Sequence, residues 1–210
     1  MPAFSTEEAK GRPAGAPEFL AYSPKSCAQV RLYCRPSFWR WAVAEFNPYI
    51  TDVLVNQITL NLDRERVSVA LQYEKQGGLN FVFSKREITG NAEIEIMEYS
   101  IRNEIKSEFL GAKCLREEQV HIENLLCMLS YINKFKEIYT ERNLELAFHV
   151  IDRCDGTISG TVRELQYKYP EGAAALLFEL VRRGRVIISD LQQKRISGLT
   201  RVDVFRVGYG

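Results

Sequence analysis

The chain of 210 residues has no long apolar run and only two histidines. Its longest apolar runs, such as residues 173–178, are far shorter than the roughly 20 residues that cross a bilayer. The N-terminal stretch MPAFSTEEAKGRPAGAPEF lacks the basic-then-apolar order of a signal peptide. These absences predict a cytoplasmic protein that does not enter a membrane.

Motifs that would hold a metal or a cofactor are also missing. The five cysteines are irregularly spaced and contain no C-x-x-C, and His121 and His149 stand alone. Tetrahedral zinc sites need closely paired ligands, so we expect reduced thiols packed in cores and structural histidines. No G-x-S-x-G, phosphate-binding glycine loop or H-E-x-x-H occurs. The sequence therefore predicts no cofactor and no metal.

Local patterns predict three regions: a flexible lead-in at 1–28, an α/β domain at 29–140, and a small helical domain at 141–210. The lead-in is rich in Pro, Gly and Ala. In the α/β domain we expect a helix at 36–46, strands at 53–62, 67–73 and 79–83, a helix at 92–109, a short strand at 113–115 and a helix at 122–139.

Two details of this domain carry specific expectations. Gly77 and Gly78 are expected to supply the positive φ of a hairpin turn. In the helix at 92–109, the apolar residues recur at three- and four-residue spacing, which predicts that they form the core-facing side. They are Ile94, Met97, Ile101, Ile105 and Phe109.

The C-terminal region has a different pattern. Thr157 and Gly184 are the expected start and stop signals of its helices. Three helices followed by a strand, a basic loop and a second strand predict a winged helix-turn-helix, which docks on protein or DNA. The expected helices cover 144–151, 157–167 and 171–183, and the expected strands cover 185–188 and 202–207.

The charge of this region is modestly basic. From Gly156 onward there are nine Lys/Arg and five Asp/Glu residues. An excess of this kind favours a polyanion or an acidic protein as partner. The candidate contact residues are Arg182, Arg183, Arg185, Lys194, Arg195 and Arg201.

A metal-dependent nuclease of α/β type would need acids that this chain lacks. Such a site has a carboxylate before the sheet, an Asp on one hairpin strand, and an acid-x-Lys on the next, so that the carboxylates hold Mg²⁺. The strand VSVALQY has no acid, and LNFVFSK has none before its lysine. Lys85 alone occupies a suitable position.

Three stretches of the chain resemble the TnsA endonuclease subunit of heteromeric cut-and-paste transposases. Glu45-Phe46-Asn47-Pro48 with Ile50 and Gln57 resembles the E-F-D-P-x-V segment of that family. Residues 115–131 (LREEQVHIENLLCMLSY) resemble its T-E-E-x-I segment. Residues 157–201 resemble its C-terminal domain, with the match centred on LVRRGRV. The resemblance covers about Leu32 to Phe205.

This resemblance implies a restriction-endonuclease-like mixed-sheet domain followed by a winged helix-turn-helix. It also implies a TnsB-like transposase subunit and a TnsC-like ATPase regulator as partners, with double-stranded DNA nearby. The family's first acid falls near Ser37, and its strand aspartate falls on 68–71, where no acid stands. We therefore interpret the chain as a TnsA-like, catalytically inactive docking subunit in DNA transposition, with Lys85 a remnant of the site.

Two alternatives remain open from the residues. One is an active Mg²⁺-dependent endonuclease that cleaves transposon ends with displaced acids from Glu45, Glu74 and Glu87. The other is a DNA-binding regulator or inhibitor with a borrowed fold. An aromatic cluster would be a partner surface in the second case, although its helical spacing is more typical of a core. Its members are Phe38, Trp39, Trp41 and Phe46.

Overall fold

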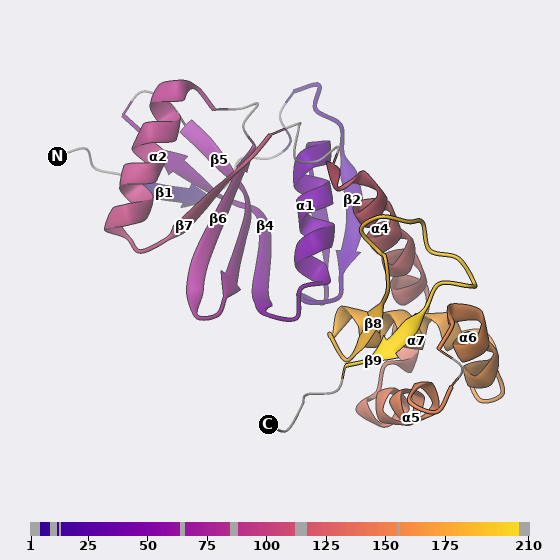
Figure 1. Cartoon of the computed structure of the whole chain (residues 1–210). Helices are drawn as coiled ribbons and strands as arrows, with labels where there is room; N and C mark the ends of the chain where they lie inside the picture. Colours follow the sequence, from indigo (N-terminus) through magenta and orange to yellow (C-terminus); the bar gives the residue numbers. More distant parts are fainter. Residues whose placement is uncertain are drawn as a thin grey trace. The chain divides into compact units, whose positions relative to one another are not determined.

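The computed structural model describes residues 5–8, 12, 14–63, 66–84, 88–111, 117–154 and 156–205. In this part the chain is an α/β protein with a mixed sheet (Figure 1). Its contacts divide it into two units, residues 1–45 with 49–117, and residues 46–48 with 118–210. Within the described ranges, no helix combines the length and the apolar character needed to cross a bilayer.

The first unit is built on a sheet with the order β1-β4-β5-β6-β7. Neighbouring strands are antiparallel except β6 and β7, which are parallel and are joined by the helix α2. A parallel pair needs such a crossover, because its strands run in the same direction. The elements are β1 (Ser5–Glu8), β2 (Phe19–Ser23), β3 (Ala28–Leu32), α1 (Arg35–Glu45), β4 (Ile50–Asn61), β5 (Arg66–Lys75), β6 (Gly78–Ser84), α2 (Gly90–Arg102) and β7 (Lys106–Leu110).

Helices α1 and α2 cover opposite faces of this sheet. Tyr73 of β5 pairs with Asn80 of β6, and its hydroxyl meets Arg40 of α1. Phe81, the next residue of β6, belongs instead to a buried cluster that includes Ala92 and Ile96 of α2. Successive side chains of a strand point to opposite faces, so the Tyr73 face is the α1 face.

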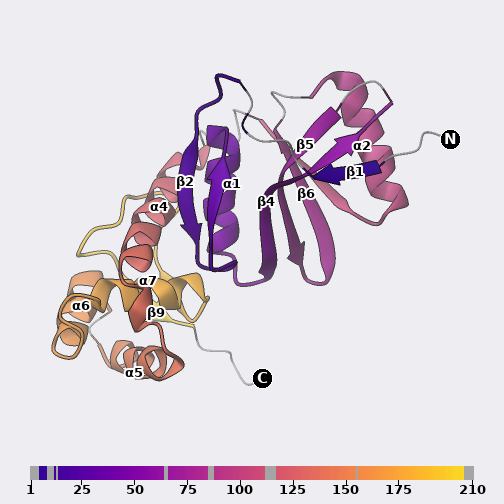
Figure 2. The ribbon, with the colours of Figure 1, turned by 180° about the vertical axis from the view of Figure 1, so that it is seen from behind.

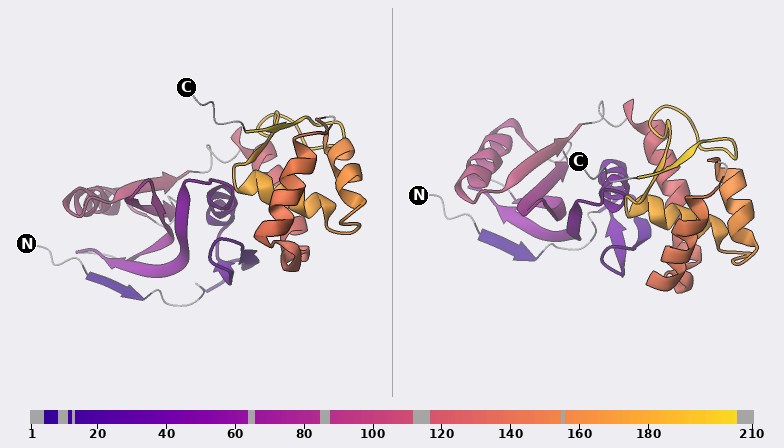
Figure 3. Two further views of the ribbon diagram at one scale, coloured as in Figure 1. Left: turned by 90° about the horizontal axis from the view of Figure 1, so that it is seen from below. Right: turned by 60° about the horizontal axis from the view of Figure 1, so that its bottom comes forward.

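Strand β4 is irregular, and Figure 3 shows it curving through the sheet. Its register with β5 shifts between Thr51 and Leu54 and again between Val55 and Ile58. Asp52 and Asn56 lie in these two gaps, each with φ 50°. Asp and Asn are among the side chains that tolerate this conformation best, so the bulges fall where the sequence allows them.

The N-terminal region differs from the expected flexible lead-in at 1–28. β2 and β3 form an antiparallel hairpin beside α1 (Figure 2), and the ring of Phe19 stacks on that of Phe38 at 5.0 Å. Phe38 also stacks on Trp41, which is buried. Of the expected partner surface, Trp41 is therefore a core residue, and Phe38 is half-buried against it. The expectation rested on the Pro, Gly and Ala of residues 11–17 and overlooked the apolar Phe19, Val30 and Leu32 of the hairpin.

The helix expected at 92–109 ends earlier, at Arg102. Glu104 adopts φ 56°, and the amide of Ile105 donates to the carbonyl of Ser100. The chain then enters β7, so Phe109 is a strand residue that stacks on Phe83. The strand expected at 113–115 lies outside the described residues.

The turn between β5 and β6 is shifted by one residue from the expected position. Gln76 (φ 52°) and Gly77 (φ 77°) supply the positive φ angles, while Gly78 already pairs with Lys75. Two central residues with positive φ suit the twist of a tight hairpin.

The second unit begins with a helix that we expected in the first domain. α4 packs against α7, which explains why the division lies near residue 118 rather than 140. The expected order of three helices and a hairpin follows, and Thr157 caps α6 by accepting from the amide of Gly160. The elements are α4 (Gln119–Lys134), η2 (Lys136–Ile138), α5 (Glu141–Ile151), α6 (Ile158–Gln166), α7 (Ala173–Arg182), β8 (Val186–Ile188) and β9 (Val202–Val204).

Candidate functional site

The α1 face of the sheet carries a cluster of three polar side chains from three elements. The guanidinium of Arg40 donates to Glu108 Oε2 at 2.7 Å and to the hydroxyl of Tyr73 at 3.3 Å. The Tyr73 hydroxyl in turn lies 3.4 Å from the same carboxylate oxygen. One positive and one negative charge therefore cancel at the centre of this face.

Burial of this cluster changes the pKa of its tyrosine. Desolvation raises the pKa of the Tyr73 phenol above its usual 10.0, Arg40 opposes the rise, and Glu108 adds to it. Tyr73 therefore remains a neutral donor at physiological pH. The Nε of Arg40 is buried without a hydrogen-bond partner in the described part of the chain, so the guanidinium is oriented by Glu108 and Tyr73.

We expect the stability of the first unit to fall as pH rises above 10, partly because of Tyr73. The phenol ionises near pH 10 in the unfolded chain, whereas it keeps its proton to a higher pH in the folded chain. The free energy of unfolding therefore falls as pH rises from 10 through the higher pKa of the folded state. Thermal melts across this range should show a smaller alkaline loss for Tyr73→Phe. The exposed Tyr49→Phe serves as the control and should behave like the parent chain. Equal slopes for the parent and Tyr73→Phe would contradict the expectation.

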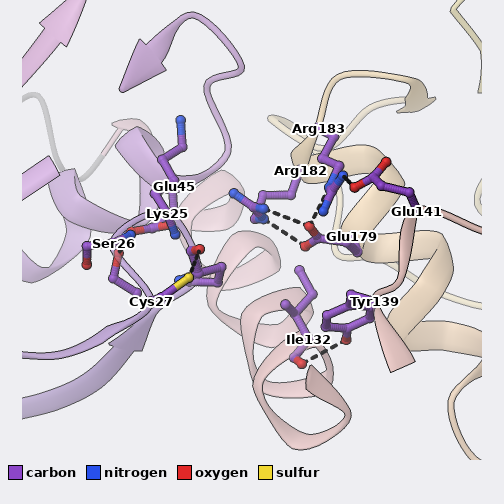
Figure 4. A network of polar contacts seen from close by, with 12 residues as sticks. Lys25, Ser26, Cys27, Glu45, Ile132, Tyr139, Glu141, Glu179, Arg182 and Arg183 are labelled. Atoms are coloured by element: carbon purple, nitrogen blue, oxygen red, sulfur yellow. Dashed lines mark hydrogen bonds and ion pairs between the residues drawn. The ribbon is translucent and has the colours of Figure 1, made fainter. Parts of the chain in front are cut away.

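The described residues contain no group of three or more His, Cys, Asp or Glu side chains that could hold a metal. Of the displaced acids, Glu74 is exposed on β5, and Glu87 lies outside the described residues together with Lys85. Glu45 is fully buried. Its carboxylate accepts from Ser23 Oγ and, at 3.2 Å, from the amide of Lys25, so it anchors the β2–β3 turn (Figure 4).

In the second unit, two of the expected contact residues belong to an ionic network centred on the buried Glu179 (Figure 4). Arg182 donates twice to the Glu179 carboxylate, both times at 2.7 Å. Arg183 joins Glu179 to Glu141, also at 2.7 Å each. The side chains of Glu179 and Arg182 are only 3% and 10% exposed. This network fixes the end of α7 and leaves little free positive charge there.

Arg185 is neutralised in a similar way. It donates to both oxygens of Glu145, at 2.6 and 3.2 Å, and lies 4.2 Å from the centre of the Phe148 ring. The hydrogen bond from Arg185 is the main cause that lowers the pKa of Glu145. The cation is therefore held on α5 by a bidentate pair and an aromatic face.

The loop between β8 and β9 carries the other expected cations. Lys194 pairs with Asp190 at 2.9 Å and Arg195 with Glu123 at 2.8 Å, whereas Arg201 makes no ion pair with any described residue. Five of the six expected contact residues thus have an acidic partner within their own unit. Residues 118–210 contain 13 Lys/Arg and 12 Asp/Glu, so the net charge falls from +4 in the tail to +1 once α4 and α5 are included.

Besides the Arg195–Glu123 pair, the side chain of Asn124 fastens this loop to α4. The Asn124 amide donates to the carbonyls of Leu191 (2.8 Å) and Lys194 (2.7 Å) and accepts from the amide of Ile196 (3.0 Å). Asn124 is 3% exposed. A buried amide with three bonds to one loop holds that loop in a single conformation.

Helix α7 lies at the centre of the unit. It packs against α4, α5, α6 and β8, and every residue from Ala175 to Val181 is buried. A helix that reads bases must present polar side chains to the major groove. In this arrangement α7 has no such face.

Two further cations that make no ion pair with a described residue were not predicted from the sequence. A cleft of about 420 Å³ in the second unit is lined by Val150, Arg153, Cys154, Gly160, Arg163 and Glu164. Arg153 and Arg163 are exposed, and neither makes an ion pair with a described residue. The spacing of Glu179 before Arg182 and Arg183 was the available signal, because acids three and four residues away on a helix capture such cations.

Comparison with known proteins adds no family assignment: the chain matches no protein-family model and no curated protein.

Proposed function

We propose that this chain is a TnsA-like subunit without nuclease activity that acts by docking in DNA transposition. The observation that carries the proposal is the neutral Arg40–Tyr73–Glu108 cluster on the α1 face of the mixed sheet. A nuclease of this type would use that region to hold Mg²⁺ with two or more carboxylates.

The order of elements supports the proposal. A helix, three antiparallel strands, a crossover helix and a parallel fourth strand follow one another as α1, β4, β5, β6, α2 and β7. The TnsA resemblance implies this restriction-endonuclease-like order. Fold order alone does not give an activity, so the chemistry of the face decides between enzyme and docking subunit.

That chemistry favours docking. On the α1 face, β5 carries Leu71 and Tyr73, and β6 carries Asn80 and Val82, and none of these four side chains is acidic. The single carboxylate of the polar cluster, Glu108, already pairs with Arg40. Binding a divalent cation there would require breaking that pair and would leave one ligand, which is too few for Mg²⁺.

The second unit is proposed to be a winged helix-turn-helix that docks without reading bases. The buried α7 and the fastened loop argue against insertion into a DNA groove. Arg153 and Arg163 at the α5–α6 cleft, which make no ion pair with a described residue, make that surface the better contact for a phosphate backbone or an acidic partner.

The first experiment is a nicking assay on transposon-end DNA with Mg²⁺ or Mn²⁺, beside a TnsA-family protein that retains its acids. We expect no metal-dependent nicking by this chain, alone or with a TnsB-like transposase. Metal-dependent nicking that Lys85→Ala abolishes would replace the proposal with an active endonuclease.

The second experiment tests docking directly. The chain should co-purify with a TnsB-like transposase or a TnsC-like ATPase, with or without DNA. The double variant Arg153→Glu and Arg163→Glu should weaken the complex, whereas Lys194→Glu, at a cation already paired with Asp190, should not. Absence of any complex under all these conditions would count against a docking subunit.

A further inference from the structure

Helix α2 is apolar on the side that faces solvent. Ile94, Met97 and Ile101 are 59%, 46% and 79% exposed. They follow one another at intervals of three and four residues, so they lie in one stripe along the helix. The buried residues of α2 are Ala92, Ile96 and Ser100, which lie on the other side. The sequence predicted that the stripe would face the core, and this prediction is wrong.

The stripe is not needed to form the helix. Thr89 caps the first turn by accepting from the amide of Ala92, and Asn103 donates to the carbonyl of Tyr99 at the end. Ile96 and Ala92 secure the helix to the sheet. Single exposed apolar residues are ordinary, but a contiguous stripe of large ones is typical of a surface that another molecule covers.

The charges beside the stripe indicate what covers it. Glu93, Glu95 and Glu98 lie on α2 against one basic residue, Arg102, which pairs with Glu98 at 3.5 Å. The helix therefore carries two net negative charges around an apolar centre. Two copies of this face would bring like charges together, whereas a partner with basic flanks would be attracted.

We propose that the exposed face of α2 binds a basic amphipathic helix of a partner protein. The partner's apolar residues would pack on Ile94, Met97 and Ile101, and its Lys or Arg side chains would meet the flanking glutamates. This inference does not depend on the proposed role in transposition, because it uses only the first unit and requires no DNA.

The test uses the full chain and a synthetic Leu/Lys amphipathic peptide of about five helical turns as the probe. Fluorescence anisotropy should detect binding that weakens as salt rises, because Glu98 is exposed and Glu93 and Glu95 are only half-buried. A Leu/Glu peptide of the same pattern should bind at least about tenfold more weakly. NMR shift changes should concentrate on the α2 stripe.

Two variants distinguish binding at this face from non-specific apolar binding elsewhere on the chain. Met97→Ser with Ile101→Ser should reduce affinity by about tenfold or more, since central apolar anchors dominate such interfaces. Leu20→Ser, which alters an equally exposed apolar residue of β2, should leave binding unchanged. Circular dichroism should show that both variants fold.

Three results would overturn the proposal. They are equal binding of the Leu/Glu peptide, binding insensitive to the α2 substitutions, and a dimer in sedimentation that Ile101→Ser dissolves. The last result would assign the stripe to a second copy of this chain.

Discussion

Replacing Glu179 by Ala is expected to destabilise the second unit by about 3–5 kcal/mol, because it leaves the buried Arg182 without its acidic partner. Arg182 has 10% of its side chain exposed and directs two hydrogen bonds at Glu179. Without the carboxylate, the guanidinium keeps its desolvation cost and loses its partner. Thermal or urea denaturation of the full chain, followed by NMR signals of this unit, measures the loss.

Glu141→Ala is the matched control. It removes the other carboxylate bound to Arg183, but that carboxylate is 75% exposed, so the expected loss is below about 1 kcal/mol. A double variant, Glu179→Met with Arg182→Met, removes both charges together and should recover much of the stability. Equal losses for Glu179→Ala and Glu141→Ala would contradict the view that burial makes this network important.

The second large effect is expected for Asn124→Ala, which should lower the free energy of unfolding by roughly 2–4 kcal/mol because three hydrogen bonds are lost. The carbonyls of Leu191 and Lys194 and the amide of Ile196 would all lose their partner. The loop between β8 and β9 would then keep only the exposed Arg195–Glu123 pair with α4 among its described side-chain contacts to that helix. Trypsin should cut after Lys194 or Arg195 in the variant under conditions that leave the parent chain intact.

Asn124→Asp provides a second test, in which the accepting oxygen stays and the donating group is lost. The aspartate still accepts from Ile196, but it turns two donor contacts into repulsion between a carboxylate and carbonyl oxygens. Its loss should therefore exceed that of Asn124→Ala. Gln119→Ala, which removes an exposed contact to Glu123 on the same helix, is the control and should change neither stability nor cleavage appreciably. Unchanged cleavage in both Asn124 variants would show that the loop is held by other contacts.

Much of the fold could be predicted because local signals were strong. Pro36 and the Asn47-Pro48 pair bracket α1, and alternating apolar residues mark β5. Thr157 marks the start of α6. In these segments the local preference and the tertiary environment agree.

The end of α2 and the start of β7 could not be predicted in the same way. Ile105 and Phe109 fit the helical spacing as well as they fit a strand, and Glu104 is not a residue that normally adopts positive φ. Only the parallel pairing with β6 makes the strand favourable. The face of α2 was also misjudged, because the helix has two apolar sides and the sheet selects the one with the smaller residues.

The candidate site shows the same limit. The pairing of Glu179 with Arg182 and Arg183 follows from helical spacing and could have been predicted. The pairs Glu145–Arg185 and Glu123–Arg195 join residues distant in sequence, so they depend on how α5 and α4 pack. A count of charges therefore overstated the free positive charge of the tail.

The central position of α7 has a consequence for how this unit opens. Four neighbouring elements bury nearly every side chain of the helix, so its amides cannot meet water unless those neighbours separate. Local fluctuations elsewhere, at helix ends or in the exposed turn of α6, leave it protected. Amide hydrogens of α7 should therefore exchange only through global unfolding, and their exchange rates should report the free energy of unfolding of the whole unit.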